Sequence, residues 1–144
     1  MRILMGLCAL WCTGAMMAGE KKLMHCFAFT VIPEATDADW VAFKKATDAL
    51  PGKIPGLTKV WYGKLRAPLN IQTVDAATSK KLGAGEKDVA GPVNRVRRSY
   101  GVCMEMDSVD TLAVYSKHPE HDGWVKVYEK VRVAGTTTFD IIGE

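Results

Sequence analysis

A strand–helix–strand pattern that occurs twice constrains this chain more than any other feature of its sequence. Each half begins with a short run of aromatic and β-favouring residues, continues with apolar side chains at helical spacing, and ends in a second strand-like run. The order predicts an α+β protein with one split β-α-β-β-α-β sheet and both helices on one face of it. The expected strands are residues 24–31, 57–65, 99–106 and 136–142. The expected helical stretches are residues 36–50 and 109–131, the second interrupted at Pro119.

A long segment between the two halves does not follow this pattern. Residues 66–98 show no strong periodicity, contain several Pro and Gly residues, and end in the basic run Arg95, Arg97 and Arg98. Structureless segments of this length are uncommon inside a compact domain and tend to be functional or disordered. Residues 75–82 are compatible with one short helix. Two interpretations stay open: a mobile surface insertion, or a lid or anion-contacting segment.

The first residues of the chain have the composition of a targeting segment. Arg2 precedes an apolar run over residues 3–11, and small residues follow up to residue 19. This order is typical of a secretory signal peptide, and the run is short for an uncleaved membrane anchor. We therefore expect a signal peptide over residues 1–19 and a domain over residues 20–144. The mature protein would be periplasmic or secreted, with no stable membrane association.

The charge balance argues against two classes of partner. Beyond residue 19 the chain carries 18 basic and 16 acidic residues, a formal charge of +2. Such a balance predicts no binding to nucleic acid or to an anionic membrane. No cofactor is expected from the sequence.

Helices on one face leave the other face of the sheet uncovered. Met24, Cys26 and Ala28 of the first strand and Cys103 of the third would lie there, and an exposed apolar face of this kind usually marks an interface. The simplest solution is a homodimer that buries sheet against sheet. Cys26 and Cys103 share this face, where they form either a cross-strand disulfide or two small buried side chains.

Several segments resemble the stress-responsive dimeric α/β barrel family. The likeness covers residues 24–65 and 99–142, and its most specific part is the run from Tyr115 through His118-Pro119-Glu120-His121 to Gly123-Trp124. The resemblance implies a ferredoxin-like monomer whose sheet pairs with that of a second copy to close a barrel. It also implies distant similarity to plant polyketide cyclases of the olivetolic acid cyclase type.

The resemblance to the cyclases implies a candidate site. The catalytic Tyr and His of those enzymes match Tyr115 and His121, and the supporting polar positions match His25 and Asp140. Tyr100 stands where the cyclases carry a second strand histidine. By strand parity and helical spacing, an apolar pocket between sheet and helices would also include Phe27 and Trp124, although aromatic residues at such positions also fill cores.

Three functions stay open at this point. The first is a dimer of unassigned activity that binds a small apolar or phenolic ligand. The second is a cyclase or lyase with His121 as base and Tyr115 as donor, and the third is a structural stress-response dimer with a filled core. A metal site made by His118, His121 and His25 is a weaker alternative, because Pro119 interrupts the helix that would align the first two; we expect no metal. His118 and His121 could instead stabilise the helix break at Pro119.

Overall fold

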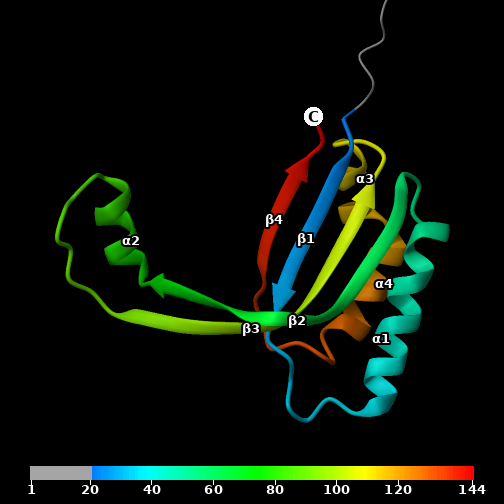
Figure 1. The fold of residues 1–144 in the computed structure, drawn as a ribbon, viewed down its shortest axis with the longest axis horizontal. Coiled ribbons are helices and arrows are strands. Elements are labelled where there is room, and N and C mark those ends of the chain that lie inside the picture. Colours follow the sequence, from blue (N-terminus) through cyan, green and yellow to red (C-terminus); the bar gives the residue numbers. More distant parts are fainter. Residues whose placement is uncertain (1–20) are drawn as a thin grey trace, which may run out of the picture.

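A computed structural model of the protein describes residues 21–144, and the expected signal peptide lies outside this range. One four-stranded antiparallel sheet forms the centre of the fold, with strand order β2-β3-β1-β4. Helices α1 and α4 cover one of its faces (Figure 1). The elements are β1 (Leu23–Phe29), α1 (Asp37–Ala49), η1 (Leu50–Gly52), β2 (Leu57–Val74), α2 (Ala76–Gly83), β3 (Val93–Met106), α3 (Thr111–Lys117), α4 (Pro119–Tyr128) and β4 (Thr137–Ile142). The predicted α+β architecture is confirmed.

Local chemistry explains where the two covering helices begin. Thr36 caps α1: its side chain accepts from the Asp39 N–H, and the Asp39 carboxylate accepts from the Thr36 N–H over 3.0 Å. Pro119 occupies the first position of α4, where its missing N–H has no helical partner to lose. The interruption that the sequence predicts at Pro119 is present: the helical stretch over residues 109–131 consists of two helices, α3 and α4, separated at His118.

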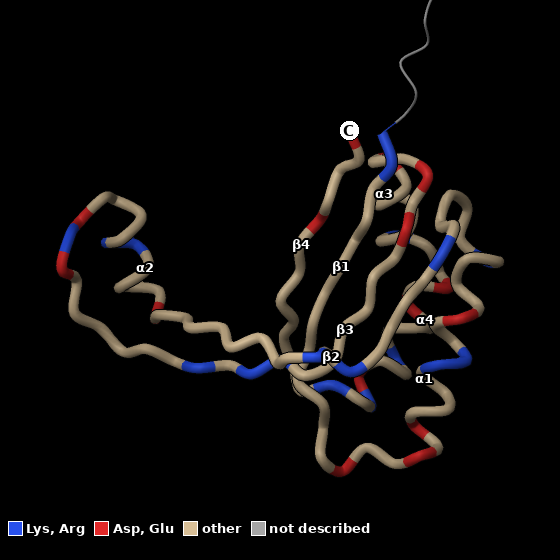
Figure 2. Tube along the Cα trace, in the orientation of Figure 1, with Lys and Arg blue, Asp and Glu red and all other residues tan. Residues whose placement is uncertain are grey.

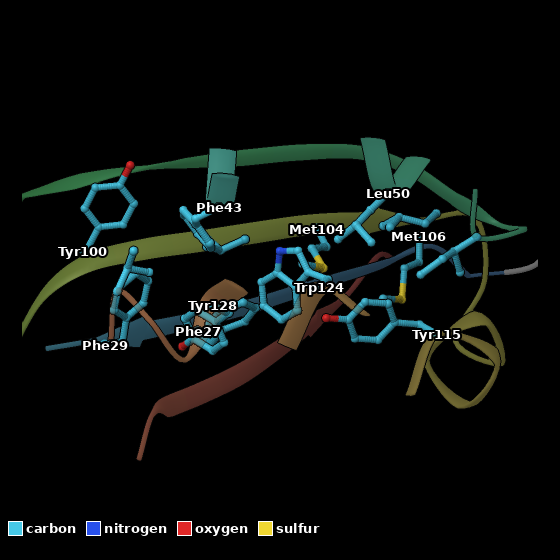
Figure 3. Close-up of a cluster of buried hydrophobic side chains, with 14 of the residues drawn as sticks. Phe27, Phe29, Phe43, Leu50, Tyr100, Met104, Met106, Tyr115, Trp124 and Tyr128 are labelled. Atoms are coloured by element: carbon cyan, nitrogen blue, oxygen red, sulfur yellow. The ribbon is translucent and has the colours of Figure 1, made fainter. Parts of the chain in front are cut away.

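The core lies between the sheet and the helices (Figure 3). Tyr100, Val102 and Met104 of β3 alternate inward and are almost fully buried, as period-two patterning predicts. From α1, Phe43 is fully buried and packs against Tyr128 of α4 with ring centroids 5.9 Å apart. An aromatic core of this kind holds each ring in one orientation, which positions the polar atoms at its edge.

Residues 66–98 form a protruding hairpin, which we call the arm, and not a structureless insertion. Strands β2 and β3 continue past the sheet as a two-stranded ribbon from the pair Leu69 and Arg98 to the pair Val74 and Val93. Helix α2 lies at its tip, as the pattern over residues 75–82 indicated. Figure 1 shows the arm on the opposite side of the sheet from α1 and α4.

The face of the sheet without helices, which we call the open face, is apolar as predicted. Cys26 and Cys103 are direct cross-strand partners at its centre and form a disulfide, with their Cα atoms 4.2 Å apart. Trp61 and Phe139 are 47% and 49% exposed there. No helix within residues 21–144 is long and apolar enough to span a membrane.

Candidate functional site

The helix break at Pro119 assigns different positions to the neighbouring histidines. His118 is the N-cap of α4, where its Nδ1 accepts from the Glu120 N–H over 3.2 Å. This contact gives His118 a structural role at the break. His121 lies in the first turn of α4, and its Nδ1 is buried. Within residues 21–144 no group of three or more His, Cys, Asp or Glu side chains is placed to hold a metal.

A cavity of about 170 Å³ lies where α4, β1 and the start of β4 meet. Its histidine and aromatic walls come from residues far apart in the sequence: β1 contributes His25 and Phe27, α3 contributes Tyr115, and α4 contributes His121 and Trp124. Five of the seven sequence-predicted site residues therefore share one cavity. The complete lining is His25, Phe27, Tyr115, His121, Trp124, Val125, Tyr128, Arg132, Thr136 and Thr138.

Tyr115 and His121 lie in direct contact. Their ring centroids are 4.5 Å apart with the planes at 60°, an edge-to-face arrangement. Figure 3 shows the hydroxyl end of Tyr115 directed toward Trp124. On its other side, Tyr115 lies 5.9 Å from the ring of His25. The two residues expected to carry acid–base chemistry are thus neighbours on one wall of the cavity.

Asp140 supports the site from outside the cavity. It is the β4 register partner of His25, and its Oδ1 accepts from His25 Nδ1 over 2.6 Å. The His25 side chain is only 15% exposed, so this carboxylate fixes its ring and directs the second ring nitrogen away from Asp140. Asp140 acts on the cavity through His25.

Burial sets the protonation of the two central groups. It lowers the pKa of His121, so the imidazole is neutral at neutral pH. It raises the pKa of Tyr115 well above its ordinary value, so this phenol keeps its proton. The pair combines a neutral imidazole that can accept a proton with a phenol that can donate a hydrogen bond.

Trp124 and Phe27 contribute apolar walls. Trp124 Nε1–H donates to Thr47 Oγ1 over 2.8 Å, so the indole N–H is already paired. Its ring stacks on that of His121 with centroids 5.9 Å apart. Phe27 meets Trp124 edge to face at 5.9 Å. Both rings also belong to the core. Phe27 and Trp124 therefore line the cavity and fill the core at the same time, the two roles that the sequence left open for them.

Tyr100 does not join this cavity. It packs between Trp40 and Phe29 and lines a separate cleft of about 640 Å³ near the root of the arm. Figure 3 shows Tyr100 and Tyr115 at opposite ends of the core. The position of Tyr100 in β3 places it on the helix-facing side of the sheet, as the sequence indicated. Its cross-strand partner is Phe29, however, which lies four residues along β1 from His25, a separation of roughly 13 Å. Its placement in the same pocket was wrong.

Comparisons with known proteins establish the fold. The chain is similar to a dimeric protein of unknown function from Bacteroides fragilis, at 18% identity over 83% of this chain and 94% of that chain, with a TM-score of 0.52. It is also similar to the hydroxynitrile lyase of Passiflora edulis (10% identity, 86% and 94% covered, TM-score 0.57). A Dabb family protein from Mesorhizobium loti matches at 13% identity, with 87% and 99% covered and a TM-score of 0.54.

The fold is ferredoxin-like. Two of these three structures carry that description, and the strand order and helix placement above agree with it. No family model and no curated protein sequence matches the chain. At these identities the likeness concerns the fold, so the chemistry has to be inferred from the residues of the cavity.

Two residues with buried, unpaired polar atoms complete the cavity. Tyr128 was expected from the sequence as an aromatic residue that could line a pocket between sheet and helices, whereas Arg132 was not singled out. The Tyr128 hydroxyl and Arg132 Nε are buried without a hydrogen-bond partner among residues 21–144, as is His121 Nδ1. The available signal was an arginine directly after Val131, the last apolar residue at helical spacing in the sequence, where a long side chain can fold back over the end of α4.

Proposed function

We propose that this protein binds a small, mainly apolar molecule of about one ring that carries a carbonyl or hydroxyl group. The supporting observation is that His121, Tyr128 and Arg132 line one cavity, and that His121 Nδ1, the Tyr128 hydroxyl and Arg132 Nε are buried without partners among the residues described. A buried polar group without a partner costs about 1–3 kcal/mol. A ligand oxygen that accepts from Arg132 and Tyr128 would recover part of this cost.

The cavity volume sets the size of the ligand. A cavity of about 150 Å³ is large enough to hold benzene, and the cavity here has about 170 Å³. Aromatic rings of Phe27, Trp124 and Tyr115 make the walls, which suits a flat ring. A polyketide chain of several rings would have to extend beyond this space, so we favour a phenol or an aromatic aldehyde.

A second candidate function is acid–base catalysis on such a ligand. Neutral His121 would take a proton from a hydroxyl or from a carbon next to a carbonyl, while Tyr115 donates a hydrogen bond to the oxygen that gains negative charge. The contact between these two rings at 4.5 Å favours this candidate. The similar fold of the hydroxynitrile lyase shows that this scaffold can carry a lyase.

Calorimetry with phenol and benzaldehyde tests ligand binding. We expect saturable binding of at least one of them, weakened by Tyr128→Phe and unchanged by Tyr62→Phe, since the Tyr62 hydroxyl contacts Asp48 outside the cavity. Absence of binding, or equal effects of the two variants, would reject the proposed pocket. For the catalytic candidate, His121→Ala should retain binding and abolish the cleavage of a cyanohydrin to its aldehyde; unchanged cleavage would exclude His121 as the base.

We also propose that the protein works as a homodimer joined through its open face. The exposed apolar residues of this face support the proposal, and three solved structures with similar folds are described as dimeric. Gly63 lies on this face, and a Cβ built there meets nothing within 4 Å. Gly63→Leu should therefore give a folded monomer in sedimentation velocity, whereas Gly52→Leu, equally unobstructed but in η1, should stay dimeric. A dimeric Gly63→Leu variant would exclude this interface.

We further propose that the protein is exported and that it belongs to the stress-responsive α/β barrel family. The disulfide between Cys26 and Cys103 supports export, because disulfides persist in oxidising compartments. The N-terminal sequence of protein purified from its host provides the test. A mature start close to residue 20 is expected, and a chain that begins at Met1 would contradict cleavage.

A further inference from the structure

A second and larger cavity, which we call the arm-root cleft, lies where the arm leaves the sheet. Its volume is about 640 Å³, against about 170 Å³ for the cavity that contains His121. Helix α1 contributes Trp40 and Lys44 to the cleft, and strands β2 and β3 contribute Lys64 and Tyr100. Pockets for small molecules measure about 300–1,000 Å³, so the arm-root cleft has the size of a ligand site.

An irregular stretch of β2 supplies one wall of the cleft. The two strands pair as far as Lys64 and Tyr100 and pair again from Leu69 and Arg98, so four residues of β2 lie opposite one residue of β3. Pro68, from this surplus stretch, lines the cleft. Extra residues in an edge strand are common next to functional sites, where they change the direction of side chains. The same irregularity therefore starts the arm and shapes the cleft.

Two aromatic rings give the cleft an apolar wall. The rings of Trp40 and Tyr100 lie with their centroids 4.9 Å apart and their planes tilted by 42°. Tyr100 is only 7% exposed, and Trp40 packs against the core. Both rings are thus held in place before any ligand arrives, and fixed aromatic rings of this kind suit the flat body of an aromatic ligand.

The hydroxyl of Tyr100 is available to a ligand. The hydroxyl of Tyr62 on the adjacent strand donates to Asp48 over 2.9 Å, whereas that of Tyr100 has no hydrogen-bond partner among residues 21–144. Figure 3 shows the Tyr100 hydroxyl directed away from Phe29. Burial raises the pKa of Tyr100, so the phenol keeps its proton and can donate a hydrogen bond to an anion.

The charges that line the cleft favour an anion with a single charge. Lys44 and Lys64 line it from α1 and β2, and neither has an ion-pair partner in the described part of the chain. Among the described lining residues only Asp37, two turns before Lys44 on α1, is acidic. The sum of +1 matches a carboxylate, whereas a phosphate monoester carries about −1.5 to −2 at neutral pH. Figure 2 shows basic residues, drawn in blue, on α1 and on β2 where the arm begins.

We infer that the arm-root cleft is a second binding site and that it takes a small aromatic carboxylate. The flat body of the ligand packs against the rings of Trp40 and Tyr100, and its carboxylate lies between Lys44 and Lys64. The Tyr100 hydroxyl donates to the same carboxylate. The inference does not depend on the ligand proposed for the cavity that contains His121, because no residue lines both cavities.

Calorimetry of the mature protein with 2-naphthoate tests the class of ligand. A two-ring acid is too large for a cavity of about benzene size, so its binding reports on the arm-root cleft. We expect saturable binding of 2-naphthoate, and roughly tenfold weaker binding of the neutral 2-naphthalenemethanol. Absence of naphthoate binding, or equal affinity for the alcohol, would overturn the inference. Tighter binding of 2-naphthyl phosphate than of 2-naphthoate would overturn the assignment to a carboxylate.

Adjacent lysines of α1 provide matched variants. Lys44→Gln removes a charge that lines the cleft, and Lys45→Gln removes the same charge from an exposed neighbour that does not line it. The dissociation constant of 2-naphthoate should rise about threefold or more for Lys44→Gln and change by less than about twofold for Lys45→Gln. Tyr100→Phe should weaken binding as well, whereas Tyr62→Phe should not.

Two outcomes of the variant series would contradict the site. Equal effects of Lys44→Gln and Lys45→Gln, or unchanged binding in Tyr100→Phe together with Lys44→Gln, would place naphthoate outside the arm-root cleft. Phenol binding serves as the internal control, because it should be the same in Lys44→Gln as in the unmodified protein. Failure of the second site would therefore leave the cavity that contains His121 unaffected.

Discussion

Tyr128→Phe is the sharpest test of the cavity, because it deletes one buried oxygen and keeps the ring. The ring stacks on Trp124 at 4.7 Å, and the Arg132 guanidinium lies 4.7 Å from its centroid. Both contacts remain possible for Phe. The hydroxyl has no partner among residues 21–144, so its removal relieves a cost instead of breaking a bond.

The expected gain follows from that missing partner. An unpaired buried hydroxyl costs about 1–3 kcal/mol, so Tyr128→Phe should raise the free energy of unfolding of the ligand-free protein by roughly 1–2 kcal/mol. For a domain of this size the melting temperature should rise by about 4 °C for each kcal/mol. The affinity for phenol should fall at the same time, since the hydroxyl that binds it is gone.

Tyr62→Phe is the matched control. Its hydroxyl donates to Asp48 Oδ2 over 2.9 Å, and burial, together with this bond, raises the pKa of Tyr62 to about 12. The same substitution there should lower the unfolding free energy by about 1 kcal/mol. Urea unfolding followed by circular dichroism measures both variants. If Tyr128→Phe destabilises as Tyr62→Phe does, the Tyr128 hydroxyl is already paired in the empty protein, and the proposed reason for ligand binding is refuted.

Three further predictions concern the disulfide, the histidine and the core tryptophan. Replacing both Cys26 and Cys103 by Ala opens a cross-link over 77 residues and should cost about 4 kcal/mol in urea unfolding; a loss below about 1 kcal/mol would contradict it. Because burial lowers the pKa of His121, the unfolded chain binds its proton first, so stability should fall as the pH drops below about 6.5, and His121→Asn should remove that part of the slope. An identical pH dependence in the variant would contradict the buried neutral imidazole. Trp124→Phe removes the bond to Thr47 and leaves a small void, so we expect a loss of about 2 kcal/mol or more, checked by thermal unfolding.

Hydrophobic periodicity was sufficient to predict the sheet and its covering helices, because each element buries one face. The alternation of His25, Phe27 and Phe29 identified the helix-facing side of β1, and the cavity indeed lies on that side. The same alternation placed Cys26 and Cys103 on the same face of the sheet. It could not decide whether they form a disulfide, because strand parity specifies a face and not the register of the two strands. The register brings these residues directly across from each other.

The arm escaped prediction for a specific reason. Residues 69–72 alternate apolar and polar side chains as a strand does, but Pro68 precedes them and argued against continuing β2. In the structure Pro68 falls in the irregular stretch between Lys64 and Leu69, where the register shifts and the ladder does not require its N–H. A proline at a bulge therefore interrupts the pairing without ending the strand.

The roles of His118 and His121 depend on the N–H that proline lacks, here at the start of a helix. Both histidines flank Pro119, and spacing alone could not say which would stabilise the break. Pro119 supplies no N–H, so the first available donor is that of Glu120, which only the side chain before the proline reaches at 3.2 Å. His118 therefore caps the helix, and the cap starts α4 so that its first turn carries His121 to the cavity.

Replacing His118 by Asn, a good cap, should therefore preserve both stability and phenol binding, whereas His118→Ala should lower stability by about 1 kcal/mol. Loss of binding in a stable His118→Asn variant would show that His118 also contributes to the site.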